Sequence, residues 1–177
     1  MHWLITAISF TLGVSFVCSL LEALILSTTV ADIESLKQRR ARRGQLLEEL
    51  KRSLDQTISA ILTLNTVANT LGSVIVGGLA TKLFGDAVLG VLSAALTLAI
   101  LIFSEVLPKN IGVIYRRELQ PHVVYPLWWI RRALSPVTYL CNLLVRWLVP
   151  ARHADTSSDE EIILLAERGA RQGTLSR

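Results

Sequence analysis

Three long stretches of the chain contain no charged residue, and charged segments separate them. The uncharged stretches run from 3 to 21, from 56 to 81 and from 87 to 104. Each approaches the ~20 residues that a helix needs to cross about 30 Å of hydrocarbon. They are too long for the alternating strands of about 10 residues in a membrane β-barrel. Because a helix satisfies its own backbone hydrogen bonds in lipid, the pattern predicts three membrane-spanning helices, at about 3–29, 57–83 and 87–113.

The segment between the first two spans is predominantly basic. From Asp32 to Asp55 it contains seven Lys and Arg residues and five acidic ones. Cytoplasmic loops of membrane proteins are enriched in Lys and Arg, so we expect this segment in the cytoplasm. The N-terminus then lies outside, the 82–86 turn is external and the C-terminus is cytoplasmic. The expected location is the plasma membrane or the bacterial inner membrane.

This basic segment also carries apolar residues among its charges. Leucines at 36, 46, 47, 50 and 54 give residues 31–55 an amphipathic character. We expect an amphipathic helix on the inner leaflet, where its basic residues would meet anionic lipids, with a break near Gly44. A solvated helical hairpin without lipid contact is the alternative.

Residues 119–150 are apolar but carry features that oppose a fourth span. Arg131 and Arg132 would both lie in its middle, and each buried Arg costs about 2.5 to 3.5 kcal/mol. Pro121, Pro126 and Pro136 interrupt the stretch, and its Trp and Tyr residues are typical of a membrane interface. We expect kinked helices along the cytoplasmic interface, a juxtamembrane belt, rather than a fourth crossing.

Composition agrees with a membrane protein. Of the 177 residues, 51% are hydrophobic and 18% charged, and the mean hydropathy is +0.49, which excludes a soluble enzyme or a disordered chain. The net charge of +4 is explained by cytoplasmic loops, so we expect no nucleic-acid partner and no enzymatic activity. The predicted fold class is an all-α membrane protein, with a transmembrane domain at 1–150 and a cytosolic linker helix at 151–177.

Polar residues inside the spans are the best candidates for function, since hydrocarbon offers them no partner. Ser15, Ser19 and Glu22 share one face of the first span, and Asn65 and Asn69 lie one turn apart on the second. Such residues also serve as hydrogen-bonded links between helices, worth around 0.6 kcal/mol each. That purely structural interpretation remains open for the serines and asparagines.

Glu105 in the third span is harder to explain by packing alone. An ion pair with Lys109, one turn later, is the simplest structural interpretation. Pro108 lacks an N–H, so it leaves the Ser104 carbonyl unpaired and bends or ends the helix. A carboxylate beside a free carbonyl is a site rich in oxygen, which suits a cation. With no His or Cys cluster nearby, the donors favour Mg²⁺ over Zn²⁺ or copper, while Na⁺, Ca²⁺ and a proton remain open.

The same residues carry a resemblance to a known family. Ser19, Glu22 and Ser27 stand in CSLLEALILS, two asparagines stand in LNTVANT, and a Glu-x-x-Pro-Lys motif stands in SEVLPK. In this order the motifs resemble the transmembrane domain of the CorC/CNNM (cyclin M) family, which is associated with Mg²⁺ export coupled to Na⁺ entry. The tail EEIILLAERGARQGTLS is similar to that family's linker into a cytosolic pair of cystathionine-β-synthase-type (CBS) repeats.

The resemblance implies a homodimer of three-span protomers with Mg²⁺ in a cavity that faces the cytoplasm. The matching metal ligands are Ser19, Asn65, Asn69 and Glu105. The matching supporting residues are Glu22, Pro108, Lys109 and Ser104, the last of which stands where the family usually has Gly. Full-length relatives would carry the CBS-pair module.

Two other functions stay open at this point. The chain could be a membrane scaffold or Mg²⁺ sensor without transport, in which the polar residues only hold helices together. It could also be a small proton-coupled exporter of organic cations that uses Glu22. That function calls for an aromatic cage around the carboxylate, and the neighbouring sequence contains none.

Overall fold

The computed structural model describes residues 1–85, 87 and 89–148, and every regular element of these residues is a helix. The elements are α1 (His2–Ser27), α2 (Val30–Arg39), α3 (Ala41–Arg52), α4 (Leu54–Phe84), α5 (Leu89–Ala99), η2 (Ile100–Val106), α6 (Leu107–Ile114) and α7 (Arg116–Leu148). The predicted linker helix at 151–177 lies outside the described residues.

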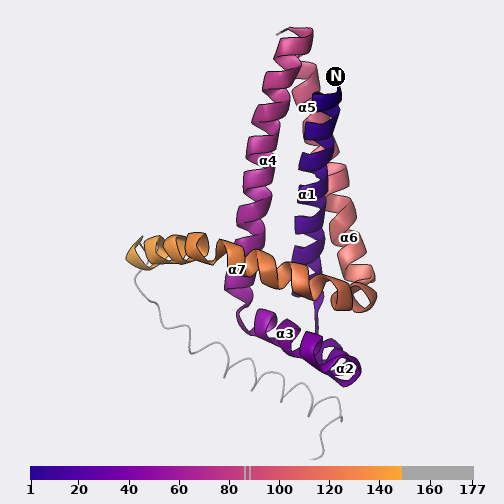
Figure 1. Ribbon diagram of the computed structural model, residues 1–177, viewed down its shortest axis with the longest axis vertical. Coiled ribbons are helices and arrows are strands. Elements are labelled where there is room, and N and C mark those ends of the chain that lie inside the picture. Colours follow the sequence, from indigo (N-terminus) through magenta and orange to yellow (C-terminus); the bar gives the residue numbers. More distant parts are fainter. Residues whose placement is uncertain (86, 88, 149–177) are drawn as a thin grey trace, which may run out of the picture. The chain divides into compact units, whose positions relative to one another are not determined.

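Three of these helices are long and apolar enough to cross a membrane: α1, α4, and the continuous α5–η2–α6 segment from Leu89 to Ile114. The predicted all-α membrane fold with three spans is confirmed. Figure 1 shows the three spans side by side, with α7 running across their ends. The α1 helix packs against both α4 and the third span, so α1 is in a position to bring polar groups from the other two together.

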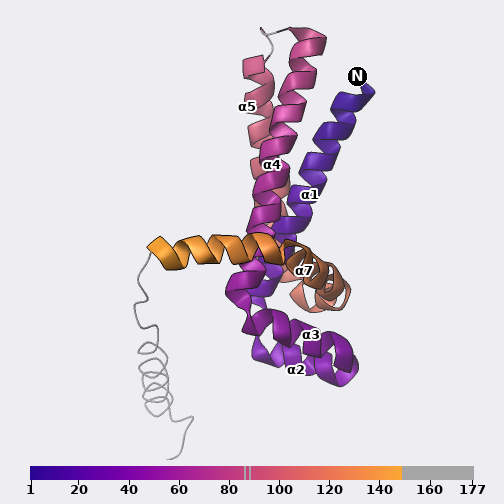
Figure 2. The ribbon, with the colours of Figure 1, turned by 60° about the vertical axis from the view of Figure 1, so that its left-hand side comes forward.

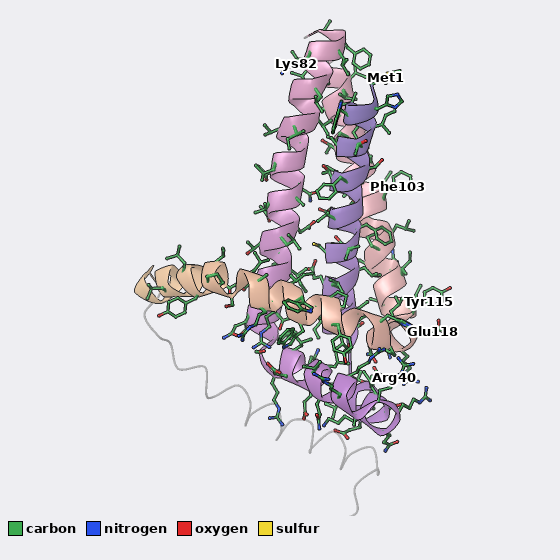
Figure 3. All side chains as sticks on the ribbon, viewed as in Figure 1. Met1, Arg40, Lys82, Phe103, Tyr115 and Glu118 are labelled. Atoms are coloured by element: carbon green, nitrogen blue, oxygen red, sulfur yellow. The ribbon has the colours of Figure 1, made fainter. Side chains whose placement is uncertain are left out.

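The outer surfaces of the spans are apolar. Large side chains such as Trp3, Phe10, Val74 and Val91 are each about 70% exposed or more. Charged side chains gather instead around α2, α3 and the start of α7, where Arg40 and Glu118 lie, as Figure 3 shows. An apolar belt of this kind belongs in hydrocarbon, which explains why so little of each span is buried in protein.

The basic segment folds as a hairpin of two short helices, α2 and α3. Its break is at Arg40 and not near Gly44 as predicted from the sequence. Gly44 lies inside α3, where a Cβ atom would stand 2.6 Å from the Lys37 Cα. The glycine is therefore needed for the close approach of the two helices rather than to end one of them.

The apolar face of this hairpin is covered by protein. Leu36, Leu47 and Leu50 are buried in one cluster with residues of α1, α4 and α7. The buried members of the cluster are Cys18, Leu21, Ile25, Ile33, Leu36, Leu47, Leu50, Ile61, Val124 and Leu127. These leucines contact other helices of the protein, and contact of the hairpin with the inner leaflet stays a prediction.

The α7 helix begins at Arg116 and continues through Pro121, Pro126 and Pro136. Among the described helices, α7 is long enough to span a membrane but is not one of those that are also apolar enough to do so. Its own residues Val124 and Leu127 are fully buried, in the cluster that includes leucines of the hairpin. Figures 1 and 2 both show α7 between the spans and the α2–α3 hairpin.

Pro108 does not end the third span, which continues to Ile114. The helix instead widens before the proline, and η2 has π-helical pairing in which the Leu107 N–H donates to the Ile102 carbonyl five residues back. A wide turn makes room for the proline ring, which would clash with a regular preceding turn. Ser104 and Glu105, both candidate site residues, lie inside this turn.

Candidate cation site

Three polar side chains meet between α1 and α4. The Ser15 hydroxyl donates to Asn65 Oδ1 at 2.7 Å, and the Asn69 amide donates to the same oxygen at 3.4 Å. Ser15 is fully buried and the two asparagines are half-buried. The one-turn spacing of Asn65 and Asn69 thus places both amides on the face of α4 that meets α1.

Two oxygen atoms at this junction have no hydrogen-bond partner. They are Ser19 Oγ, one turn along α1 from Ser15, and Asn69 Oδ1. Ser19 is fully buried. Leaving a buried polar group unpaired costs about 1 to 3 kcal/mol, so unpaired atoms in a folded protein call for an explanation such as an ion or a water. An oxygen-binding cation would satisfy both.

Glu105 lies on the third span, half-buried, and makes no hydrogen bond or ion pair within the part of the chain that the structure describes. Its neighbour Ser104 is fully buried and donates to the Leu12 carbonyl of α1 at 3.1 Å. The structure therefore groups Ser15, Asn65 and Asn69, with Ser19 one turn away. Among the described residues, no hydrogen bond or ion pair joins Glu105 to this group.

Lys109 pairs with Glu22 rather than with Glu105. Its Nζ lies 3.3 Å from Glu22 Oε2, and the two side chains are 47% and 15% exposed. The alternative interpretation of Glu105, an ion pair within its own helix, is therefore not what the structure contains. Glu22 acts here as a link between α1 and the third span.

Close packing holds α1 against its two neighbours. A Cβ at Gly112 of α6 would stand 2.8 Å from the Leu20 carbonyl oxygen, and a Cβ at Gly72 of α4 would overlap the Thr11 side chain. Small residues permit such approach in membranes, where van der Waals packing drives helix association. This close approach fixes the position of Ser15 and Ser19, measured along the axis of α1, relative to the other two spans.

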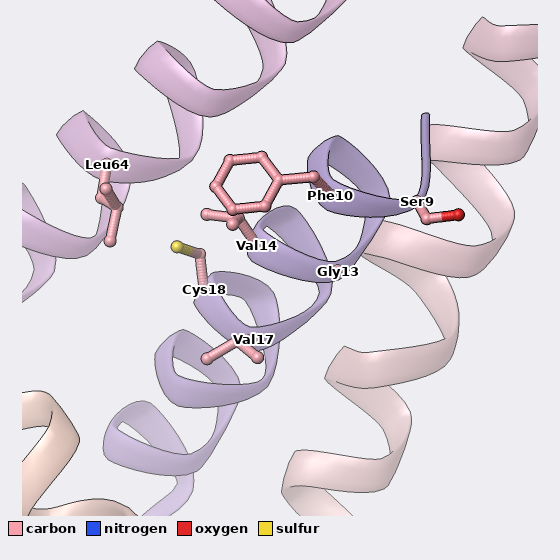
Figure 4. Close-up of a pocket in the computed structure, with 7 residues that line it drawn as sticks. All are labelled: Ser9, Phe10, Gly13, Val14, Val17, Cys18 and Leu64. Atoms are coloured by element: carbon pink, nitrogen blue, oxygen red, sulfur yellow. The ribbon is translucent and has the colours of Figure 1, made fainter. Parts of the chain in front are cut away.

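An apolar cavity of about 380 Å³ adjoins α1 near these serines (Figure 4). Its lining residues are Ser9, Phe10, Gly13, Val14, Val17, Cys18 and Leu64. Only Ser9 has a side-chain oxygen, so the cavity offers little to a hard cation, which binds through several oxygens. The oxygens of Ser15, Ser19 and the two asparagines are not part of its lining.

A second polar cluster, at the ends of the spans, was not predicted from the sequence. Asp32 is only 3% exposed and receives bonds from Arg117 Nε at 2.7 Å and Arg116 Nε at 3.1 Å. It also forms a reciprocal capping box with Thr29 at the start of α2. Burial alone would raise the pKa of Asp32, but hydrogen bonds from Thr29 and both arginines hold that pKa well below its usual range.

The Asp32 cluster links the start of α2 to the start of α7. Next to it, Gln120 Nε2 donates to Thr28 Oγ1 at 3.1 Å, and both side chains are buried. The T-x-x-D spacing of Thr29 and Asp32 is a helix-start signal that could have identified the capping residue from the sequence. Nothing in the spacing indicated the two arginines, which lie 84 and 85 residues away.

The side chains that the structure groups provide amide and hydroxyl oxygens, and the third span provides Glu105 as the predicted carboxylate ligand. Within residues 1–85, 87 and 89–148 no three His, Cys, Asp or Glu side chains are grouped as metal ligands. Amide and hydroxyl oxygens with one carboxylate form a hard, weakly charged set, which suits a cation that keeps part of its water shell.

Comparison with known proteins adds a family. The sequence profile of the cyclin M transmembrane N-terminal domain matches residues 6–177. A UPF0053 protein of Synechocystis sp. is 28% identical over 172 residues, which is 97% of this chain and 50% of that protein.

Two further relatives match less of their own length. The UPF0053 inner membrane protein YfjD of Escherichia coli is 31% identical over 108 residues, 61% of this chain and 25% of that protein. A chloroplastic DUF21 domain-containing protein of Arabidopsis thaliana is 28% identical over 163 residues, 90% of this chain and 25% of that protein. The chain thus spans half or less of the length of these three relatives.

Proposed function

Because the chain belongs to the cyclin M transmembrane domain family, we propose that it is a secondary transporter that exports Mg²⁺ from the cytoplasm. In this proposal Mg²⁺ occupies a cavity within the membrane that opens to the cytoplasm, and Na⁺ entry drives its export. The observation that carries the proposal is the pair of buried, unpaired oxygens, Ser19 Oγ and Asn69 Oδ1, at the junction of α1 and α4.

The chemistry of Mg²⁺ supports this assignment. Mg²⁺ dehydrates reluctantly and is usually held through one or two carboxylates with several waters retained. Ser19, Asn65 and Asn69 would then contact the ion or its waters, while Glu105 would provide the negative charge. A weakly charged site also suits a transporter, which has to release its cargo on the other side.

The remaining residues have supporting roles in the proposal. Glu22 and Lys109 link α1 to the third span beside the site. Pro108 maintains the widened turn that carries Glu105, and Ser104 fastens that turn to α1. None of these roles includes a covalent step, so the proposed activity is transport and not enzymatic.

The partners and location are part of the same proposal. We place the protein in a plasma or inner membrane as a homodimer, with its N-terminus outside and its C-terminus in the cytoplasm. The relatives are two to four times longer than the portion matched here, which is consistent with additional domains such as a CBS-pair module. The extensive apolar surface of the spans leaves room for both lipid and a second copy.

A scaffold or Mg²⁺ sensor is the second candidate function. One observation favours it: the short Ser15–Asn65 hydrogen bond joins α1 to α4 without any ion. In that case the polar residues would serve helix packing alone, and no flux would depend on them.

A flux measurement in oriented vesicles separates the two functions. The full chain is reconstituted with a Mg²⁺-sensitive dye on the side opposite the basic α2–α3 hairpin, with and without a Na⁺ gradient. We expect Mg²⁺ to reach the dye only in vesicles that contain the protein. Its flux should be faster when the gradient drives Na⁺ from the side of the dye to the side of the hairpin. A Mg²⁺ flux that is the same with and without the Na⁺ gradient would refute coupling to Na⁺. Absence of Mg²⁺ flux in a protein that binds Mg²⁺ would favour the sensor function.

A further inference from the structure

A polar pocket of about 270 Å³ lies where the middle of α7 meets the end of α3 and the start of α4. Its lining residues are Glu49, Gln56, Trp128, Arg131, Arg132, Ser135 and Thr138. The pocket contains none of the candidate Mg²⁺ ligands, and its two guanidinium groups would repel a cation. It therefore requires a separate explanation.

The pocket has one more positive charge than negative. Arg131 is 22% exposed and lies 3.3 Å from Glu49 Oε1, while the Glu49 side chain is 56% exposed. Arg132 is exposed and makes no ion pair among the residues that the structure describes. A solvent-exposed pair such as Arg131 with Glu49 is weak, so Arg131 can also bind an incoming anion.

Guanidinium groups recognise phosphate in particular. The planar group presents several N–H donors that match two phosphate oxygens at once, and arginine is weakly hydrated compared with lysine. Ser135 adds a hydroxyl to the same lining, one turn after Arg131. The pocket thus combines two cationic groups with a neutral donor at the spacing of successive helical turns.

The position of α7 indicates where such a phosphate comes from. Alongside the pocket α7 exposes an apolar stripe, in which Trp129 is 65% and Leu140 57% exposed. Arg132 follows Trp129 by three residues and so borders this stripe. An interfacial helix with this pattern places its apolar side among acyl chains, while its arginines stay at the level of the headgroups.

We propose that this pocket binds the phosphate of an anionic phospholipid in the leaflet that adjoins α7. The guanidinium groups of Arg131 and Arg132 hold the phosphate, and the acyl chains lie along the apolar stripe. Basic pockets beside transmembrane helices are suited to anionic headgroups, because the local surface potential and the direct contact act together. The proposal does not depend on Mg²⁺ transport.

Native mass spectrometry of the full chain in neutral detergent tests the site. The protein is titrated with phosphatidylglycerol and, separately, with phosphatidylcholine. We expect phosphatidylglycerol to bind at least ten-fold more tightly, and the double variant Arg131→Gln/Arg132→Gln to lose that preference. The matched control Arg40→Gln/Arg42→Gln removes the same charge from the exposed far end of the hairpin and should keep it.

Other outcomes would overturn the proposal. Equal binding of phosphatidylglycerol and phosphatidylcholine by the parent would overturn it. An equal loss of the phosphatidylglycerol preference in the two double variants would also overturn it, because it would show only a general attraction between positive charge and anionic lipid. If millimolar inorganic phosphate displaced bound phosphatidylglycerol as effectively as added phosphatidylglycerol does, the pocket would be a site for free anions and not for a lipid. If the arginine variant fails to fold, Ser135→Leu fills the pocket with both arginines kept, and unchanged lipid preference in that variant would refute the site.

Discussion

Glu22 Oε2 of α1 lies 3.3 Å from Lys109 Nζ of the third span, and so the carboxylate at the end of α1 is neutralised by a lysine from another helix. The lysine follows Glu105 by one turn, yet it leaves that carboxylate without a partner among the described residues. Glu22 and Glu105 therefore have different electrostatic surroundings, since Glu22 is paired with a lysine and Glu105, within the described part of the chain, is not.

A double-mutant cycle measures this link. Lys109→Met leaves Glu22 unpaired and should lower the melting temperature of the purified protein, whereas Lys109→Met with Glu22→Gln should recover most of the loss. The coupling energy should be about 0.5 to 1 kcal/mol, because the lysine is 47% exposed and solvent screens the pair. Additive losses in the cycle would show that the two groups do not interact in solution.

Removal of proposed ligands should weaken Mg²⁺ binding. Glu105→Gln and Asn69→Ala should each raise the dissociation constant at least ten-fold, about 1.4 kcal/mol, as measured by isothermal titration calorimetry. Asn110→Ala is the matched control, since Asn110 is an exposed amide near the end of the same span, and its Nδ2 donates only to the Val106 carbonyl. Binding that is unchanged in both test variants would remove these residues from the site.

The Asp32 cluster predicts a dependence of stability on pH. The pKa of Asp32 in the unfolded chain is about 3.9, and its hydrogen bonds lower the folded value. The stabilisation is therefore complete above about pH 5 and is lost as the pH falls below 4 toward the folded pKa. Melting temperatures in detergent between pH 3 and 7 should show this loss.

Asp32→Asn should remove that acid-side dependence and lower stability at pH 7 by about 1.5 to 3 kcal/mol, the range for hydrogen bonds to a charged group. Asp55→Asn is the control, since Asp55 is an exposed carboxylate in the first turn of α4. If Asp32→Asn melted with the same acid dependence as the parent, the pKa of Asp32 would not be the cause.

Two substitutions of glycine by alanine should change the stability of the protein in opposite directions. Gly112→Ala places a Cβ 2.8 Å from the Leu20 carbonyl oxygen, so the helices have to separate, at a cost of about 1 to 3 kcal/mol. Gly78→Ala meets nothing within 4 Å and should stabilise α4 by up to about 1 kcal/mol. Thermal unfolding of both variants checks the pair, and a Gly112→Ala protein as stable as its parent would contradict the close approach.

The sequence was informative where a single helix decides the outcome. Uncharged runs predicted the three spans within a few residues, and the spacing of Asn65 and Asn69 placed them on one face of α4. Contacts between residues far apart in the chain were harder to predict, since the hydropathy of a residue does not show which other residue it contacts. Neither the pairing of Asp32 with two arginines nor that of Lys109 with Glu22 follows from local spacing.

Glycine and proline were misleading for a related reason. Gly44 suggested a helix end and Pro108 a bend or an end, because each residue weakens an isolated helix. In the folded protein Gly44 permits a close crossing with Lys37, and the wide turn of η2 absorbs Pro108. Tertiary contacts thus gave both residues roles that local propensity does not reveal.

The wide turn of η2 also limits which side chains can face α1 at one time. Successive residues of a helix point in different directions, so Ser104 and Glu105 do not face α1 equally: Ser104 is fully buried and Glu105 is half-buried. In this structure Ser104 faces α1, with its hydroxyl on the Leu12 carbonyl. For Glu105 to take the place of Ser104 against α1, that hydrogen bond would have to break, so the Ser104 hydroxyl holds this turn of the third span in its present orientation.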